Sequence, residues 1–352
     1  MLVHTRASRA GYTLYPAPPF SIHVRMAESL RELQRALHSH WPVDQLQKVI
    51  DHLVAGSPLE PSGYAAYFGL IKAVDAGRYR AVSPLLATII SSPRPKTAAI
   101  TVRMLSANDF GRRGLREAKQ HFTSATLISS QLRPISGNAV QRTRRAIEAA
   151  LDFVRETAPR SWATLSEITC EIIAAHGVAR GSMTFDGCSS LERFGSILVN
   201  MNRLRSPLVL AETLVHESAH SLLFALSCHD HRVLNPATEL HQSPLRIDPR
   251  PLDGIYHAVF VLARMHNFLV EVALGPNTAP AIRDEALGLV HARQANFFDG
   301  YAVLARYAEL TPIGRELLID SLSQVQTAAS KLALTCPHIN APPRPALDLL
   351  QL

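Results

Sequence analysis

Residues 206–227 read SPLVLAETLVHESAHSLLFALS, a mostly apolar stretch whose large side chains recur at helical spacing. Ser206 has a side chain suited to cap a helix, and Pro207 suits the first helical position because its missing N–H is not needed there. The stretch therefore predicts a helix of about 206–227. Apolar side chains on it predict that it is buried: Leu208, Leu214, Val215, Leu222 and Leu226.

This predicted helix carries His216-Glu217-Ser218-Ala219-His220, an H-E-x-x-H pattern. Residues four apart share a helix face, so the imidazoles of His216 and His220 can converge on one metal ion. Glu217 has two interpretations. In a peptidase it is the general base that activates a metal-bound water, and in an iron enzyme it orients a ligand, binds substrate or has little role. The alternative for the histidines is a pair of core side chains that hydrogen-bond to neighbours.

The chain has 352 residues, of which 47% are hydrophobic and 18% are charged, and its formal net charge is +7. This composition predicts a globular protein with a large core. The basic residues are scattered. Their densest cluster, at 142–145, begins an amphipathic helix without interleaved aromatics, so we expect no nucleic-acid partner. A basic surface would instead favour an acidic peptide or an anionic cosubstrate.

The sequence also predicts a cytoplasmic protein with no membrane partner. No apolar run approaches the roughly 20 residues that span a bilayer, and residues 1–20 lack the uninterrupted apolar segment of a signal peptide. The cysteines form no C-x-x-C pair, which argues against a zinc ribbon or a disulfide scaffold. Cys228, shortly after His220, is a weak ligand candidate, and a buried free thiol is the favoured interpretation.

The pattern along the chain divides it into parts. We predict a helical N-terminal region at 1–156, a metal-binding catalytic region at 157–340 and a tail at 341–352. Residues 163–202 are β-leaning and predict a small sheet directly before the H-E-x-x-H helix. The loop at 228–248 is long enough to be a functional lid. Further helices are expected at 250–273, 281–307 and 312–333. The predicted fold class is α+β and predominantly helical.

Two histidines alone hold a metal weakly, so a third protein ligand is needed. The helix expected from about residue 250 is the place to look for it. His257 is the favoured third ligand, and Asp253 is the rival because it lies four residues earlier on the same face. A packed histidine that binds no metal is the alternative for His257. His266 lies on roughly the opposite side of that helix and is expected to be a core or surface histidine.

Arg250 and Arg264 are each seven residues from His257, so all three are expected on nearly the same helix face. Guanidinium binds carboxylate bidentately, so two arginines beside a metal would suit a carboxylate-bearing ligand. Structural ion pairs are the alternative for both arginines. Glu212, four residues before His216, is either a partner for an imidazole N–H or a solvent-facing side chain.

Segments of this region resemble a known family. FGSILVN at 194–200 is followed by L-x-E-x-x-x-H-E-x-x-H at 210–220, and D-P-R-P-L-x-G at 248–254 opens a later helix. This pattern resembles the bacterial HExxH-motif peptide-modification proteins, also described as 2-oxoglutarate-dependent HExxH-type peptide β-hydroxylases. The resemblance covers about residues 194–268. Many zinc peptidases also carry H-E-x-x-H, so the downstream stretch is what makes the resemblance specific.

The resemblance implies an iron(II) enzyme that uses 2-oxoglutarate and O₂ to hydroxylate a side-chain β-carbon of a ribosomally made precursor peptide. His216 and His220 become the iron ligands. By the spacing above, His257 is expected as the third ligand, Arg250 as the anchor for a 2-oxoglutarate carboxylate, and Arg264 as a second cofactor-binding residue. Three histidines would depart from the two-histidine, one-carboxylate triad usual in such enzymes, which keeps Asp253 open.

A peptide substrate needs a binding surface beside the motif helix. The FGSILVN strand could bind an extended peptide by strand addition, and the 228–248 loop could close over it.

Two other functions stay open from the sequence. The first is a zinc metallopeptidase, in which His216, His220 and a third ligand hold zinc and Glu217 is the base. The second is a helical peptide-binding protein whose motif is structural. The favoured interpretation is a peptide hydroxylase, a dioxygenase of natural-product biosynthesis, with a zincin-like core in which a small sheet packs beside the H-E-x-x-H helix.

Overall fold

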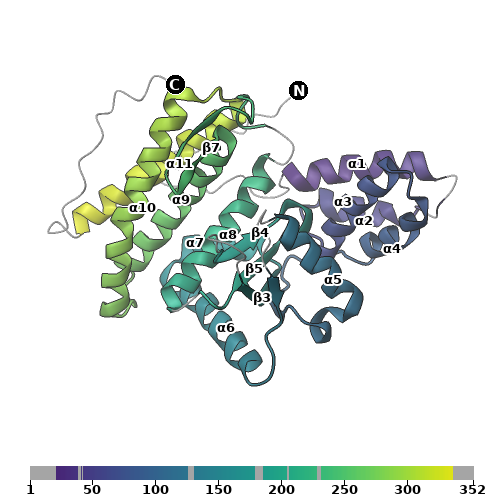
Figure 1. Cartoon of the computed structure of the whole chain (residues 1–352), viewed down its shortest axis with the longest axis horizontal. Coiled ribbons are helices and arrows are strands. Elements are labelled where there is room, and N and C mark those ends of the chain that lie inside the picture. Colours follow the sequence, from purple (N-terminus) through teal and green to yellow (C-terminus); the bar gives the residue numbers. More distant parts are fainter. Residues whose placement is uncertain are drawn as a thin grey trace.

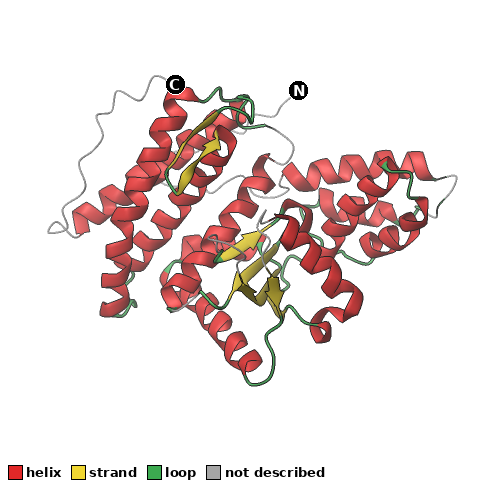
Figure 2. Cartoon of the chain, viewed as in Figure 1, coloured by secondary structure: helices red, strands yellow, loops and turns green. Residues whose placement is uncertain are grey.

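The computed structural model is predominantly helical and contains a small mixed sheet (Figure 1, Figure 2). It describes residues 21–38, 41, 43–125, 131–178, 185–203, 206–227 and 231–335. The predicted α+β, mainly helical class is therefore confirmed. The predicted tail at 341–352, Cys228 and the first residues of the 228–248 loop lie outside the described residues.

Helices form the N-terminal end of the molecule, opposite the C-terminal helices (Figure 1). They and the later helices are, in order, α1 (Ser21–Leu37), α2 (Leu46–Val54), α3 (Pro61–Asp75), η1 (Tyr79–Ala81), α4 (Val82–Ile90), α5 (Ala107–Ala125), α6 (Ala139–Thr157), α7 (Pro159–Ile168), η2 (Leu191–Arg193), α8 (Pro207–Ser227), α9 (Leu252–Leu274), α10 (Pro280–Tyr307) and α11 (Pro312–Thr335). The apolar spacing at 281–307 and 312–333 predicted α10 and α11 to within a few residues.

The main sheet has the strand order β1-β3-β5-β4, and β2 also pairs with β3. Its strands are β1 (Thr101–Met104), β2 (Gln131–Arg133), β3 (Glu171–Val178), β4 (Gly187–Ser189) and β5 (Ser196–Asn200). The β1–β3 and β3–β5 pairs are parallel, whereas β4 runs antiparallel to β5. The sheet before the H-E-x-x-H helix was expected, but β1 and β2 come from the predicted N-terminal region. One sheet therefore joins residues from both sides of position 156.

The FGSILVN segment cannot accept a peptide strand in this fold. It forms β5, which is hydrogen-bonded to β3 on one side and to β4 on the other. Its residues from Ser196 to Asn200 are all buried. The expectation of strand addition at this segment was wrong, because a strand paired on both sides has no free backbone groups. Within the described residues, β4 is the strand at this end of the sheet.

The H-E-x-x-H helix forms as the sequence predicts. The backbone N–H of Val209 donates to Ser206 Oγ at 3.1 Å, so Ser206 caps α8. Most α8 side chains are buried, because the helix packs on the sheet and on α6, α7 and α9. This central position fixes the motif between the sheet and the C-terminal helices.

The segment before α9 differs from the expectation. Arg246–Pro251 forms β7, which pairs antiparallel with β6 (Leu240–Ser243), and α9 begins only at Leu252. The reason is local: a residue before proline is disfavoured in the α region, and Arg250 precedes Pro251. Much of the supposed long loop is thus a β-hairpin, and Arg250 lies on a strand and does not share a helix face with His257.

The α9 helix is the most apolar long helix of the described chain. By length and composition it could cross a bilayer, which the sequence did not lead us to expect. However, 72% of its most apolar window is buried inside the protein. The helix packs against α8, α10 and α11, and Figure 1 shows α9, α10 and α11 side by side. Its apolar character is therefore that of a core helix surrounded by other helices.

Candidate functional site

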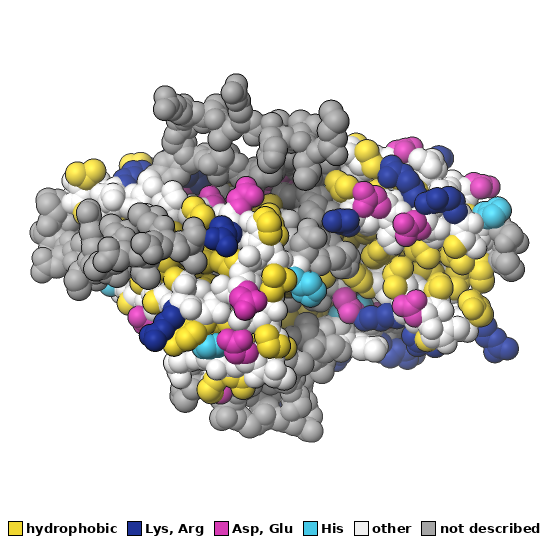
Figure 3. Space-filling view, turned by 90° about the horizontal axis from the view of Figure 1, so that it is seen from above, with side chains coloured by type: hydrophobic (Ala, Val, Ile, Leu, Met, Phe, Trp, Pro, Cys, Tyr) yellow, Lys and Arg dark blue, Asp and Glu magenta, His cyan; other side chains and the backbone are white. Residues whose placement is uncertain are grey.

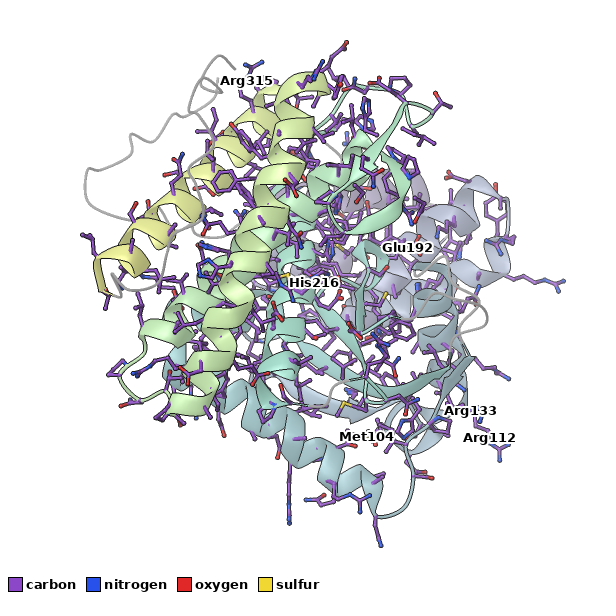
Figure 4. The ribbon with its side chains drawn as sticks, turned by 60° about the vertical axis from the view of Figure 1, so that its left-hand side comes forward. Met104, Arg112, Arg133, Glu192, His216 and Arg315 are labelled. Atoms are coloured by element: carbon purple, nitrogen blue, oxygen red, sulfur yellow. The ribbon has the colours of Figure 1, made fainter. Side chains whose placement is uncertain are left out.

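The motif histidines meet in the middle of the molecule, where Figure 4 labels His216. The Nε2 atoms of His216 and His220 lie 3.2 Å apart, and their ring centroids are 4.9 Å apart. Two nitrogens bound to one tetrahedral ion at about 2.0–2.1 Å would be separated by about 3.3 Å. The pair is therefore spaced as two ligands of one metal ion.

His257 reaches the same cluster from α9 but approaches the other side of His220. Its ring centroid is 5.7 Å from that of His220, and its Nδ1 lies 3.5 Å from Nδ1 of His220. His216 instead faces Nε2 of His220. One ion cannot be bound at the His216–His220 contact and at the His257–His220 contact at once, because they involve opposite nitrogens of His220. Among the described residues, no group of three or more His, Cys, Asp or Glu side chains is arranged to hold a metal. The His216–His220 pair fits a metal, whereas the three-histidine set as it stands does not.

Arg232 holds His257 in this orientation. The buried guanidinium donates from Nη2 to His257 Nε2 at 3.0 Å and to Asp253 Oδ1 at 2.8 Å, and from Nη1 to Ser227 Oγ at 2.7 Å. Asp253, the rival ligand, is therefore paired with Arg232, and 53% of its side chain is exposed. Sequence reasoning missed Arg232, because a single arginine in an irregular segment carries no periodic signal.

Glu217 is buried beside the histidine pair. Ser189 Oγ on β4 donates to Glu217 Oε2 at 2.8 Å, and Oε1 lies 3.9 Å from His216 Nε2. Gly187 makes room for it, because a β-carbon at residue 187 would lie 2.7 Å from Glu217 Cγ. Burial raises the pKa of Glu217 to about 7, although the hydrogen bond from Ser189 opposes the shift. A carboxyl group with this pKa can hold or release a proton near neutral pH.

The imidazoles of the cluster are held in their neutral form. Burial, and secondarily the charge of Arg293, lowers the pKa of His216 to about 4. Burial and the neighbouring Arg232 lower the pKa of His257 to about 4. Burial and the two neighbouring histidines place the pKa of His220 well below its ordinary value. Neutral imidazole is the form that binds metal ions.

The two arginines predicted to bind a cosubstrate have other partners. Arg250 lies on β7, where its Nη2 is 2.7 Å from Asp248 Oδ2. Arg264 is buried on α9 and reaches α11, with Nη1 donating to Ser321 Oγ at 2.5 Å and Nη2 to Asp320 Oδ2 at 3.2 Å. Its guanidinium also stacks 3.5 Å from the centroid of Phe260. These contacts favour the structural ion-pair interpretation of Arg264.

Arg264 lines a cavity of about 380 Å³ between α7, α8, α9 and α11. The α8 residues that line it, including Val215, Ser218 and Leu222, lie on a different face of that helix from His216 and His220. Arg264 therefore faces a space other than the one between the motif histidines.

Two other residues singled out in the sequence are placed by the structure. Glu212 is buried and accepts two hydrogen bonds from Arg293 on α10, at 2.7 and 3.2 Å, so it is neither solvent-facing nor an imidazole partner. The Nδ1 atom of His216 instead contacts Met265 Sδ at 3.2 Å. His266 is fully buried, so it is a core histidine.

The basic cluster at 142–145 begins α6, as expected, and Arg144 donates to the carbonyl of Val102 on β1. Part of this cluster is therefore occupied in holding the helix to the sheet. On the face shown in Figure 3, Lys and Arg side chains are interspersed with Asp and Glu and form no continuous stripe. An absence of nucleic-acid partners remains a prediction.

Comparison of the sequence with models of known protein families finds no match. No curated protein matches the sequence significantly. The resemblance described for residues 194–268 therefore stays a prediction, which rests on those residues and on the site that they form.

Proposed function

We propose that this protein is an iron(II)- and 2-oxoglutarate-dependent hydroxylase that acts on a side-chain β-carbon of a ribosomally synthesised precursor peptide. The observation that carries the proposal is the packing of α8 against α9. It brings His216, His220 and His257 into one cluster, and these helices belong to the segments that carry the resemblance. When bound, iron with 2-oxoglutarate and O₂ supplies the oxidising power for C–H hydroxylation.

The residues of the chain have separate tasks in this proposal. His216 and His220 hold the metal through their Nε2 atoms, which are already at the required separation. His257 completes the site once it turns away from Arg232. Glu217, fixed by Ser189, holds a proton beside the metal position. Glu217 is buried, while His216 and His257 keep 29% and 19% of their side chains exposed, so a substrate can reach the metal position from solvent.

The arrangement around α8 supports a zincin-like core. A small mixed sheet packs beside the H-E-x-x-H helix, and its antiparallel strand β4 touches the motif carboxylate through Ser189. An extended peptide pairing with β4, in place of the β5 segment favoured by the sequence, would lie next to Glu217.

A zinc metallopeptidase is the second candidate. Glu217 is the observation in its favour, since its pKa of about 7 and its 3.9 Å distance from His216 Nε2 suit a general base acting on a metal-bound water. The positions of Arg250 and Arg264 also weaken the argument for a dicarboxylate cosubstrate that the sequence suggested.

Anaerobic addition of Fe(II) and 2-oxoglutarate, followed by visible spectroscopy, separates the two functions. We expect a weak charge-transfer band that needs both additions and disappears in His216→Ala and His220→Ala, while the matched control His241→Ala keeps it. No band, together with tightly bound zinc and peptide cleavage that is lost in Glu217→Gln, would replace the hydroxylase with the peptidase. Protein that retains neither metal after gentle purification would point to a peptide-binding protein.

A further inference from the structure

The contact between Arg232 and His257 fixes where the protons of the histidine cluster lie. A guanidinium group has only donors, so His257 Nε2 must accept the hydrogen bond from Arg232 Nη2 at 3.0 Å. A positively charged His257 would turn an N–H toward this cation, so the ring is neutral. Its single proton is therefore on Nδ1.

The same reasoning passes from ring to ring. His257 Nδ1–H points at His220 Nδ1, 3.5 Å away, so that nitrogen accepts and the proton of His220 is on Nε2. His220 Nε2–H then donates to His216 Nε2 at 3.2 Å, which leaves the proton of His216 on Nδ1. That proton points to Met265 Sδ, a weak acceptor, at 3.2 Å. Every contact in the chain from Arg232 to Met265 thus has one donor and one acceptor.

This proton arrangement opposes metal binding. His220 Nε2 is the atom that stands beside His216 Nε2 at ligand spacing, yet in this arrangement it carries a proton and has no free electron pair. His257 cannot bind the metal either, because its Nε2 is hydrogen-bonded to Arg232 and its Nδ1 to His220.

We infer that Arg232 is a positioning residue that keeps the candidate metal site from binding metal. It fixes the tautomers of the three histidines in the metal-free protein, and its hydrogen bond to His257 must break before a metal ion can be bound tightly. The tautomer part rests on the geometry alone, and only the metal part rests on the proposed function.

Asp253 is the hydrogen-bond partner that would favour the other tautomer of His257. Its Oδ2 lies 3.8 Å from His257 Nε2, close enough to accept a hydrogen bond from an Nε2–H group after a small movement. Without the guanidinium, His257 would carry its proton on Nε2 and accept at Nδ1 from His220. His220 Nε2 would then be unprotonated and free to bind metal. Replacing one side chain is therefore sufficient to reverse the His257–His220 contact, while His216 keeps its proton on Nδ1 toward Met265, so both metal-facing Nε2 atoms carry free electron pairs.

The test begins with the metal-free protein labelled with ¹⁵N-histidine, because long-range ¹H–¹⁵N correlation spectra distinguish the two tautomers. Assignment uses the single His→Gln variants. We expect Nδ1–H for His257 and His216 and Nε2–H for His220. In Arg232→Met, His257 and His220 should exchange tautomers, while Arg232→Lys, which keeps a charged donor, should retain the wild-type pattern. The control Arg155→Met changes an exposed arginine that pairs with Asp152 on α6.

Zn²⁺ titration of the same proteins completes the test. Groups that orient metal-binding histidines change affinity by about 10- to 100-fold, so we expect Arg232→Met to bind Zn²⁺ about tenfold more tightly than wild type or Arg155→Met. An Nδ1–H tautomer for wild-type His220 would overturn the inference, and this needs no variant to fold. Unchanged or weaker Zn²⁺ binding by Arg232→Met would also overturn it, and neither result depends on whether 2-oxoglutarate binds.

Discussion

At the scale of single residues, Gly187 leaves the space that the Glu217 side chain fills. We expect Gly187→Ala to displace Glu217 or β4, since the added β-carbon would lie 2.7 Å from Cγ and 2.8 Å from Oε1. Overpacking of this kind lowers the free energy of unfolding by about 1–3 kcal/mol, and activity should fall with it. Urea unfolding and turnover assays measure the two effects.

The matched control for that change is Gly288→Ala on α10, where a β-carbon meets no atom within 4 Å. Alanine in a helix interior is more stable than glycine by about 0.5–1 kcal/mol, so this variant should be slightly stabilised. If the two variants have the same free energy of unfolding and the same turnover, the position of Glu217 does not depend on the space at Gly187.

Arg264 offers a test of a structural against a cosubstrate-binding role. Arg264→Met leaves Asp320 on α11, whose side chain is 26% exposed, without the guanidinium that it contacts, and leaving such a partly buried group without its partner costs about 1–3 kcal/mol. We expect a lower free energy of unfolding with unchanged affinity for 2-oxoglutarate, measured by calorimetry on the iron-loaded protein. Intact stability with lost 2-oxoglutarate binding would instead restore the role suggested by the sequence.

The sequence predicted those site residues whose positions follow from helix periodicity. His216 and His220 meet because they are four residues apart on α8, and His257 joins them from α9. Arg250 lies on β7 because Pro251 disfavours a helical backbone at the residue before it, an effect that its seven-residue spacing from His257 does not show. Arg232 depends on an irregular segment folding back onto α9, and no local pattern encodes that contact.

At the scale of elements, α8 depends on the cap at its first turn. Ser206→Ala removes the acceptor for the Val209 N–H, and loss of such a cap costs about 1 kcal/mol. We expect this decrease in urea unfolding. Ser166→Ala, which changes an exposed serine in the last turn of α7, should leave stability nearly unchanged. A similar decrease for both variants would mean that the cap contributes nothing specific to α8.

Elements that repeat an apolar pattern over many residues were predictable, and short paired strands were not. α6, α10 and α11 each run for five turns or more, so their spacing is visible in the sequence. β1 and β2 have only four and three residues, and each gains its stability from β3, which lies far along the chain. The β6–β7 hairpin is local, but its segment is rich in proline and polar residues and shows no alternation of apolar and polar side chains.

At the scale of the whole molecule, buried neutral histidines make stability depend on pH. Burial is the main cause that lowers the pKa of four histidines, His23, His216, His257 and His266, from 6.5 to about 4. Between these values the unfolded chain binds protons that the folded protein does not. The free energy of unfolding should therefore fall as the pH is lowered from about 6.5 to about 4.

Glu217 acts in the opposite direction, because its raised pKa makes the folded protein bind a proton more tightly than the unfolded chain between pH 4.5 and about 7. Burial also raises the pKa of Glu167, Glu271 and Asp320, and it also lowers the pKa of His121 and His220. Six histidines therefore oppose four carboxyl groups, so the net slope should keep the sign given above. Urea unfolding of the metal-free protein across this range measures it, and His266→Leu should reduce the slope. A free energy of unfolding that is constant across the range would contradict the prediction.

The pairing of β1 with β3 has a consequence for how the chain reaches its native state. During synthesis, β1 leaves the ribosome long before β3 and β5, so it must remain unpaired until those later strands appear. Parallel pairings across such a distance form slowly, and the nascent chain is open to misassociation while it waits. The sheet on which α8 and its histidines pack is therefore completed late, after more than half of the chain has been translated. If the chain were produced as two halves divided near residue 156, the halves would have to associate before the complete sheet could form.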